Sequence, residues 1–153
     1  MKKDINDMTE EQQIKKVRKN PFLIADIKNP SEAVQLEAVK INGNAIQYIK
    51  NPSEVVQMVA IDNYVRNITY INNPTEKVQI AAVKRYGCAI QFIDNPPEEV
   101  RLEAVRADGL AIKYIKNPSK SLQLEAIKQN KYAIKEIKNP CEEAKILVKI
   151  RKL

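Results

Sequence analysis

The chain has 153 residues, of which 44% are hydrophobic, and this is enough for one packed domain. Its formal net charge is +7, and it contains no histidine and only two cysteines, Cys88 and Cys141. This composition excludes a histidine-based catalytic pair and leaves no ligand set for zinc, so we expect neither a metal nor a cofactor.

The dipeptide Asn-Pro recurs every 22 residues and divides the chain into tandem copies of one unit. Such a period is typical of repeat proteins, in which each unit buries its apolar side against the next. We expect an N-terminal tail at residues 1–6 and a single α-solenoid domain at residues 7–153. The expected units are 7–28, 29–50, 51–72, 73–94, 95–116 and 117–138, followed by a C-terminal capping helix at 139–153.

Each unit is expected to contain a longer helix, a turn and a shorter helix. Asn29 is the predicted N-cap, Pro30 the first helical residue, and Glu32 the partner that completes a capping box. Gly43 is the predicted left-handed residue that ends the longer helix. A shorter helix follows and ends at the next Asn-Pro. The predicted fold class is all-α, a right-handed α-solenoid of tandem helix-turn-helix repeats.

The helical periodicity of unit 29–50 predicts which side chains are buried. Neither helix can cover its own apolar side, so stacking of the units is needed to form a core. The predicted core residues are Val34, Leu36, Ala38 and Val39 on the longer helix, and Ala45, Ile46 and Ile49 on the shorter one.

The run at residues 38–48, which reads Ala-Val-Lys-Ile-Asn-Gly-Asn-Ala-Ile-Gln-Tyr, is echoed at 82–92 and 104–114. It resembles the short two-helix repeats of a bacterial and phage family of unknown function and is more loosely similar to HEAT-like and leucine-rich-variant repeats. The resemblance covers residues 7–153, although unit 51–72 lacks the glycine and Glu136 replaces the tyrosine of unit 117–138. It implies a binding scaffold with no known activity.

A polar column occupies the seventh position of the unit, in the middle of the apolar arc. Because buried amides need hydrogen-bond partners, we expect bonds to backbone carbonyls near the turn or the shorter helix. Binding of a ligand is the alternative. The column consists of Gln13, Gln35, Gln57, Gln79 and Gln123, with Arg101 and Lys145 in the same register.

An aromatic column occupies the twentieth position, and it contains Tyr48, Tyr70, Phe92 and Tyr114. These rings either pack between adjacent shorter helices or stack on the bases of a nucleic acid. Packing is favoured because the column lies on the flank of the shorter helix. Glu136 interrupts the column, which argues against one base being read by every repeat.

Positive charge is concentrated toward the C-terminal end. Residues 117–153 carry nine basic and four acidic side chains, a net charge of +5, whereas residues 29–116 are neutral overall. The basic side chains either keep this end of the stack soluble or bind an acidic partner, which is a protein surface or a nucleic acid. With two tyrosines as anchors, the predicted partner-binding residues are Lys113, Tyr114, Lys116, Tyr132, Lys135 and Lys138.

Two valines, Val55 and Val59, occupy positions that are charged or polar in most other units. Exposed apolar surface often marks a protein contact, but scattered surface valines are also common. Both interpretations stay open. We expect this apolar pair on a different side of the solenoid from the lysines.

The leading hypothesis is a non-catalytic protein–protein interaction scaffold, such as an adaptor or a phage-type inhibitor of a host protein. Its partner is expected to be an acidic protein, and the chain is expected to be a monomer. The alternative is nucleic-acid binding through the basic C-terminal end. The absence of histidine and of a Gly-rich phosphate loop argues against an enzyme, and a carboxylate-based hydrolase or transferase is a third hypothesis.

The chain is expected to be cytoplasmic and not to enter a membrane. It has no apolar run of about 18 residues, and its polar N-terminus does not resemble a signal peptide. Cys88 and Cys141 lie more than two units apart, which is beyond the reach of a disulfide. Free thiols fit a reducing compartment.

Overall fold

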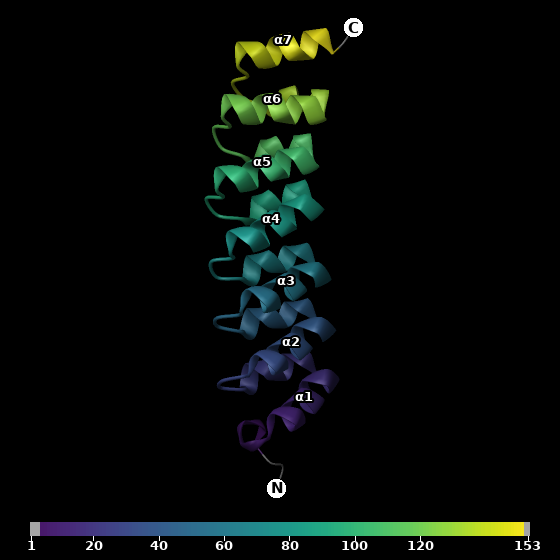
Figure 1. The fold of residues 1–153 in the computed structure, drawn as a ribbon, viewed down its shortest axis with the longest axis vertical. Coiled ribbons are helices and arrows are strands. Elements are labelled where there is room, and N and C mark those ends of the chain that lie inside the picture. Colours follow the sequence, from purple (N-terminus) through teal and green to yellow (C-terminus); the bar gives the residue numbers. More distant parts are fainter. Residues whose placement is uncertain (1–3, 152–153) are drawn as a thin grey trace. The chain divides into compact units, whose positions relative to one another are not determined.

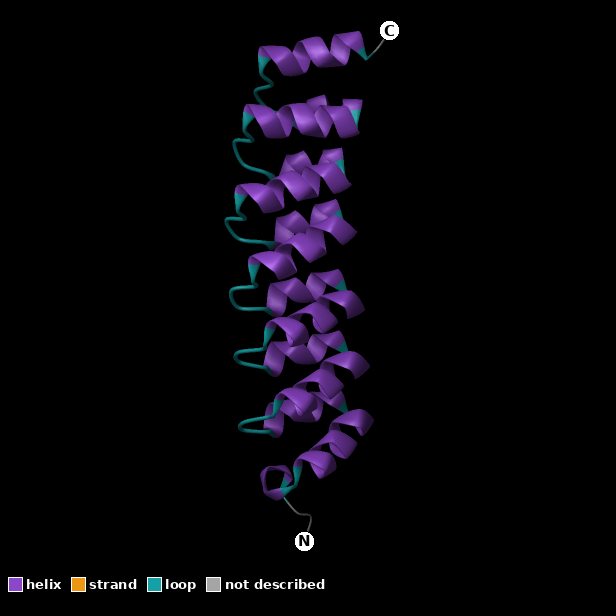
Figure 2. Ribbon diagram, viewed as in Figure 1, coloured by secondary structure: helices purple, strands orange, loops and turns teal. Residues whose placement is uncertain are grey.

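The computed structural model describes residues 4–151 of the chain. Within that range, α-helices alternate with short 3-10 helices and no strand is present (Figure 2). The helices group into two compact parts of several repeats each, which we call the first unit (residues 4–78) and the second unit (residues 79–151). The predicted all-α architecture of helical repeats is confirmed, whereas the single domain at residues 7–153 stays a prediction.

The first unit consists of two rows of helices. Helix α2 packs against both α1 and α3, and η3 packs against both η2 and η4, so the α-helices form one row and the 3-10 helices the other (Figure 1). The elements are η1 (Ile5–Asp7), α1 (Glu10–Lys19), η2 (Pro21–Asp26), α2 (Glu32–Ile41), η3 (Gly43–Tyr48), α3 (Glu54–Asn63) and η4 (Val65–Tyr70).

The second unit repeats this arrangement. Helix α6 packs between α5 and α7, and η6 packs between η5 and η7. The boundary between the two units falls within α4 (Glu76–Arg85). The remaining elements are η5 (Gly87–Phe92), α5 (Glu98–Ala107), η6 (Gly109–Tyr114), α6 (Lys120–Gln129), η7 (Lys131–Glu136) and α7 (Glu142–Ile150).

The longer helices begin later than predicted, because the serine after Asn-Pro is the N-cap. In α2 the hydroxyl of Ser31 accepts the backbone N–H of Val34 at 3.4 Å. Ser53 and Ser119 cap α3 and α6 in the same way. The predicted capping box of Asn29 and Glu32 is therefore wrong, since Glu32 is the first residue of α2.

The asparagine of the Asn-Pro pair instead forms part of the turn that precedes the helix. Asn73, Asn95 and Asn117 have φ angles of 55°, 47° and 49°, which lie in the left-handed region. Asparagine tolerates this region better than most residues that carry a Cβ atom. The proline that follows then fixes the next φ angle.

The glutamates that were predicted as caps join neighbouring repeats instead. Glu54 accepts a hydrogen bond from the hydroxyl of Thr75 at 2.8 Å, and Glu98 accepts one from the hydroxyl of Ser119 at 2.9 Å. Thr75 and Ser119 also cap their own helices. The first turn of one helix is thus bonded to the cap of the next helix.

The glycines do not end the longer helices in the way predicted. None of the described glycines has a positive φ, and the C-cap before Gly109 is Asp108, whose backbone is extended with φ −150°. Gly87 and Gly109 are the first residues of η5 and η6, where the chain lies against the C-terminal end of the next α-helix. A Cβ atom at Gly87 would be 2.6 Å from the carbonyl oxygen of Ala104, so this close approach requires glycine.

The predicted core is confirmed in both units. In the first unit the side chains of Val34, Ala38, Val39, Ala45 and Ile46 have no exposed surface, and Leu36 is half-buried. In the second unit the equivalent side chains are fully buried as well, namely Val100, Ala104, Val105 and Ala111. Burial of this apolar surface is the main stabilising contribution to each stack.

The polar column forms the predicted backbone ladder. Four side chains donate to the carbonyl of the proline at the start of their own repeat: Gln35 to Pro30 at 2.9 Å, Gln57 to Pro52 at 3.0 Å, Gln123 to Pro118 at 3.1 Å and Arg101 to Pro96 at 2.8 Å. Gln13 donates to the carbonyl of Ile5 at 3.0 Å instead. The Oε1 atom of Gln123 also accepts the N–H of Cys141 at 2.8 Å. The amide therefore links two consecutive repeats. Lys145 departs from the column and contacts Glu142.

Replacement of Gln123 by leucine is expected to lower the free energy of unfolding by about 1–3 kcal/mol. The leucine would leave the carbonyl of Pro118 and the N–H of Cys141 without the bonds that the buried amide makes. Urea denaturation followed by circular dichroism measures the change. Equal or greater stability of the variant would show that the two bonds contribute nothing net. The control is Gln47→Leu, because the exposed amide of Gln47 bonds the carbonyl of Asn44 on the surface of η3.

Residues 4–6 do not form a tail, which corrects the prediction for residues 1–6. Asp4 caps η1, and the side-chain amide of Asn6 donates to the carbonyl of Asp26 at 3.0 Å. Asn6 also accepts the N–H of Lys28 at 2.9 Å. These bonds attach η1 to the end of the first repeat. The rest of the predicted tail lies outside the described residues.

Candidate functional site

The six predicted partner-binding residues all lie in the second unit, and all are exposed. Lys113 and Tyr114 end η6, Tyr132 and Lys135 belong to η7, and Lys116 and Lys138 lie in the loops after these helices. Lys113, Lys116 and Lys138 line one groove, and Lys113 also contacts the ring of Tyr114, with its ammonium group 4.8 Å from the ring centroid. Tyr132 and Lys135 contact each other.

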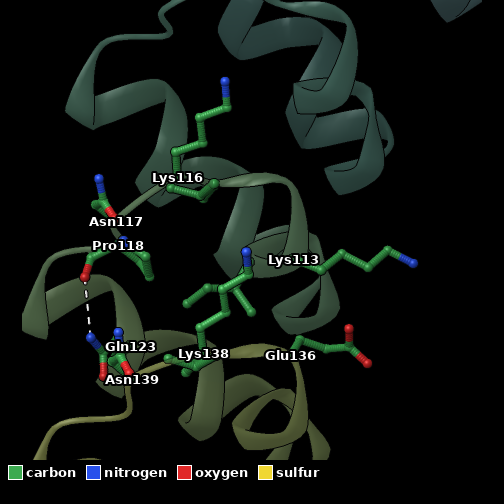
Figure 3. Close-up of a pocket in the computed structure, with 11 residues that line it drawn as sticks. Lys113, Lys116, Asn117, Pro118, Gln123, Glu136, Lys138 and Asn139 are labelled. Carbon is green, nitrogen blue, oxygen red and sulfur yellow. Dashed lines mark hydrogen bonds between the residues drawn. The ribbon is translucent and has the colours of Figure 1, made fainter.

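The groove is a cavity of about 550 Å³ between two successive Asn-Pro turns (Figure 3). Three isoleucines form its apolar part, and each has at most 7% of its surface exposed. We call this site the basic groove, and its lining residues are Ile112, Lys113, Ile115, Lys116, Asn117, Pro118, Gln123, Glu136, Ile137, Lys138 and Asn139.

The lysines surround the groove from different sides. In Figure 3 the side chains of Lys113 and Lys116 extend away from each other, and that of Lys138 lies between Lys113 and Pro118 in this view. Glu136 contributes the carboxylate in the lining. Contact with Tyr114, and to a lesser extent with Glu136, raises the pKa of Lys113 above its ordinary value, so this ammonium group is charged at neutral pH.

The backbone beneath the groove is held by the polar column. Gln123 donates to the carbonyl of Pro118 at 3.1 Å, as the dashed line in Figure 3 marks, and accepts from Cys141 on the following repeat. Both turns that border the groove are therefore bonded to one buried side chain. The groove is a pre-formed feature of the repeat stack, as is usual for binding sites.

A second, smaller cavity of about 260 Å³ lies one repeat earlier and is built from the equivalent positions. Arg101 takes the place of Gln123 there, and it donates to the carbonyl of Pro96 at 2.8 Å. Tyr114 takes the place of Glu136, so the predicted binding residue Tyr114 lines this neighbouring cavity. Lys116 lines both cavities.

Tyr132 and Lys135 form a separate cluster with Lys131, which the sequence analysis did not select. The ring of Tyr132 is 58% exposed, with the Lys131 ammonium 5.6 Å and the Lys135 ammonium 5.7 Å from its centroid. These distances are typical of cation–π contacts. The signal for Lys131 was present in the sequence, because it replaces the glycine that other repeats carry at this position.

The apolar pair lies in the other unit, on α3. Val55 is 57% exposed, and Val59 is half-buried. The prediction that these valines and the lysines occupy different sides of the solenoid stays a prediction. The aromatic column packs in part, since the ring of Tyr48 meets that of Phe22 edge to face, with 6.2 Å between centroids.

Residues 4–151 offer no cluster of three His, Cys, Asp or Glu side chains that could hold a metal ion. Both cysteines are free thiols, Cys88 on the surface and Cys141 half-buried. In the same part of the chain, every helix is too short or too polar to cross a membrane.

Comparisons of the chain with protein-family models, with curated proteins and with solved structures give no match. The resemblance to the two-helix repeat family, which rests on the run at residues 38–48, therefore stays a prediction. The function has to be argued from the groove and the residues around it.

Proposed function

We propose that this chain is a non-catalytic module that binds a protein partner through the basic groove. The observation that carries the proposal is the combination of three ammonium groups with an isoleucine-lined cavity of about 550 Å³. A partner that buries an apolar side chain there brings its carboxylates within reach of the lysines. Apolar anchors surrounded by charged residues are typical of protein interfaces.

The carboxylates support a binding role rather than catalysis. A general acid at neutral pH needs a raised pKa, but the shifted pKa values among the described carboxyl groups are all lowered. Hydrogen bonds from Arg106 and then from Lys84 lower the pKa of Glu103, for example. The glutamates at the helix starts are hydrogen-bonded to neighbouring caps.

Reversal of charge at the groove should weaken partner binding. We expect Lys113→Glu with Lys138→Glu to lower the affinity for a captured partner by about tenfold, mainly through slower association. The measurement is capture of a stoichiometric protein from a lysate of the source cell by the tagged chain, followed by titration of the purified partner. Lys40→Glu with Lys149→Glu is the control, since it makes the same change of charge on exposed faces of α2 and α7.

The apolar pair on α3 provides the opposite test. Val55→Glu with Val59→Glu should leave partner binding unchanged. Loss of binding in this variant, with the lysine variant unaffected, would place the partner on α3 and leave the basic groove as a feature of solubility. Absence of any stoichiometric protein partner at low salt would refute the proposed function itself.

A second candidate function is binding of single-stranded nucleic acid at Tyr132. The exposed ring with Lys131 and Lys135 beside it favours this candidate, because base stacking and phosphate contact use these two groups. Titration of a labelled oligothymidylate distinguishes the two candidates. Affinity that falls steeply with added salt, without a captured protein, would support nucleic acid as the partner.

The proposal includes a cytoplasmic scaffold of the adaptor or inhibitor type that acts as a monomer. Two free thiols favour a reducing compartment. A scaffold needs no cofactor, and the proposed partner is an acidic protein because the basic groove is lined by three lysines and one glutamate.

A further inference from the structure

The twentieth position of the repeat differs between the two inter-repeat cavities. Tyr114 lines the smaller cavity, of about 260 Å³, and Glu136 lines the larger one, of about 550 Å³. The isoleucines and the Asn-Pro turn are common to both cavities, whereas Gln91, Asp94 and Arg101 of the smaller cavity correspond to Lys113, Lys116 and Gln123 of the larger one. The larger cavity therefore lacks both the aromatic ring and the arginine side chain of the smaller one.

Glu136 does not replace the ring that is missing. In Figure 3 its carboxylate extends to the same side as the ammonium group of Lys113 and away from Asn117 and Pro118. Glu136 also contributes to the raised pKa of Lys113, which indicates that the two charges interact. Tyr114 lines the preceding cavity together with three isoleucines, and the ammonium group of Lys113 lies 4.8 Å from the centroid of its ring.

We propose that the basic groove binds an aromatic side chain of the partner, which takes the place that Tyr114 holds in the preceding cavity, and that carboxylates next to that aromatic residue pair with Lys113, Lys116 and Lys138. This inference rests on the proposed function and adds the chemistry of the partner segment. The segment is a short stretch of an acidic protein with one tyrosine, phenylalanine or tryptophan.

Two features select this occupant. The isoleucine edges offer the apolar contacts that a planar ring needs, and lysine ammonium groups around the ring add cation–π attraction. Three lysines against one glutamate leave the lining with a net positive charge, so acidic neighbours of the ring are attracted and basic ones are repelled. An aliphatic residue in the same acidic segment would make the apolar contacts but no cation–π contact.

The test uses the peptide acetyl-Asp-Glu-Trp-Glu-Asp-amide as the probe. The chain contains no tryptophan, so indole fluorescence reports on the peptide alone. We expect saturable binding, with a blue shift of the indole emission as the ring leaves water. Absence of saturable binding up to about 1 mM peptide, the weak limit for a specific site, would overturn the inference.

The decisive variant is Glu136→Tyr, which restores the residue type of the aromatic column. It should fill the groove and lower the peptide affinity at least tenfold, while Glu136→Gln, which changes charge but not size, should bind as well as the natural chain or better. Equal affinity of the natural chain and Glu136→Tyr would overturn the inference. Circular dichroism checks the folding of each variant, and Glu136→Phe is the substitute if Glu136→Tyr does not fold.

Two altered peptides separate the contributions of ring and charge. Replacement of tryptophan by alanine should abolish binding, and replacement of the four acidic residues by lysine should do the same. Binding of the lysine peptide as tight as that of the acidic one would also overturn the inference. Binding of the captured partner separates this inference from the proposed function. If Lys113→Glu with Lys138→Glu weakens that binding and Glu136→Tyr does not, the proposed function stands and the aromatic occupant is rejected.

Discussion

Ile127→Ala is expected to lower the free energy of unfolding by about 2–5 kcal/mol, the range observed for large-to-small changes in protein cores. The side chain of Ile127 is fully buried on α6. Helix α6 packs against α5, α7, η6 and η7, so the cavity left by the substitution has neighbours on all sides that cannot close on it easily. Urea denaturation followed by circular dichroism measures the loss.

The matched control is Ile146→Ala, which removes the same atoms from a side chain on α7 that is 52% exposed. We expect this change to alter stability by about 0.5 kcal/mol or less. Equal effects of the two substitutions would contradict the assignment of Ile127 to the core. A loss confined to one of two separate unfolding transitions would show that the second unit unfolds on its own.

Gly87→Ala is expected to lower the free energy of unfolding by about 1–3 kcal/mol. Its Cβ atom would lie 2.6 Å from the carbonyl oxygen of Ala104 and 2.8 Å from the Cβ atom of Asp108, both of which are too close. The backbone at Gly87 has no positive φ, so the loss is steric and not conformational. Alanine restricts the unfolded chain more than glycine does, which offsets about 0.4–1 kcal/mol of the loss.

Lys131→Ala is the control for Gly87→Ala, because Lys131 occupies the same position of a later repeat and is exposed. It should change stability by about 0.5 kcal/mol or less. If Gly87→Ala proves as stable as the natural chain, η5 and α5 must be able to separate without cost. That result would remove the packing explanation for the glycine.

The period and the core could be predicted from the sequence because both depend on local regularity. Val34, Ala38 and Val39 recur at the spacing of a helix side, and apolar equivalents recur in each repeat between residues 29 and 138, so burial follows from stacking alone. The glutamine column was predicted for a similar reason, since a buried amide has few partners other than nearby backbone carbonyls.

The helix starts could not be predicted because the sequence fits two registers. In Asn29-Pro30-Ser31-Glu32, both asparagine and serine are favourable N-caps, and proline is compatible with a turn as well as with a first helical residue. The structure uses Ser31 as the cap, and the carbonyl of Pro30 is the acceptor for Gln35. N-cap preferences alone do not choose between these two registers.

The lysines of the candidate site could be selected from the sequence, but their contacts with one another and with the tyrosines could not. Clustering of lysines in the last repeats was visible in the sequence, yet Lys113 and Lys138 share a groove while Lys135 pairs with Tyr132. This division depends on how the loop of one repeat lies beside the shorter helix of the next. Glu136 was visible as a break in the aromatic column, but its place in the lining of the groove required the structure.

The basic groove takes its residues from two consecutive repeats, with Lys116 supplied by one and Lys138 by the next. An in-frame duplication of one repeat in the gene would therefore add a whole new groove without any change to the core positions. Later changes at the lining positions, such as the twentieth, would then alter that groove separately from its neighbours. In such a lineage, new binding sites arise by copying and are tuned separately, so the range of partners can diversify while selection keeps the fold constant.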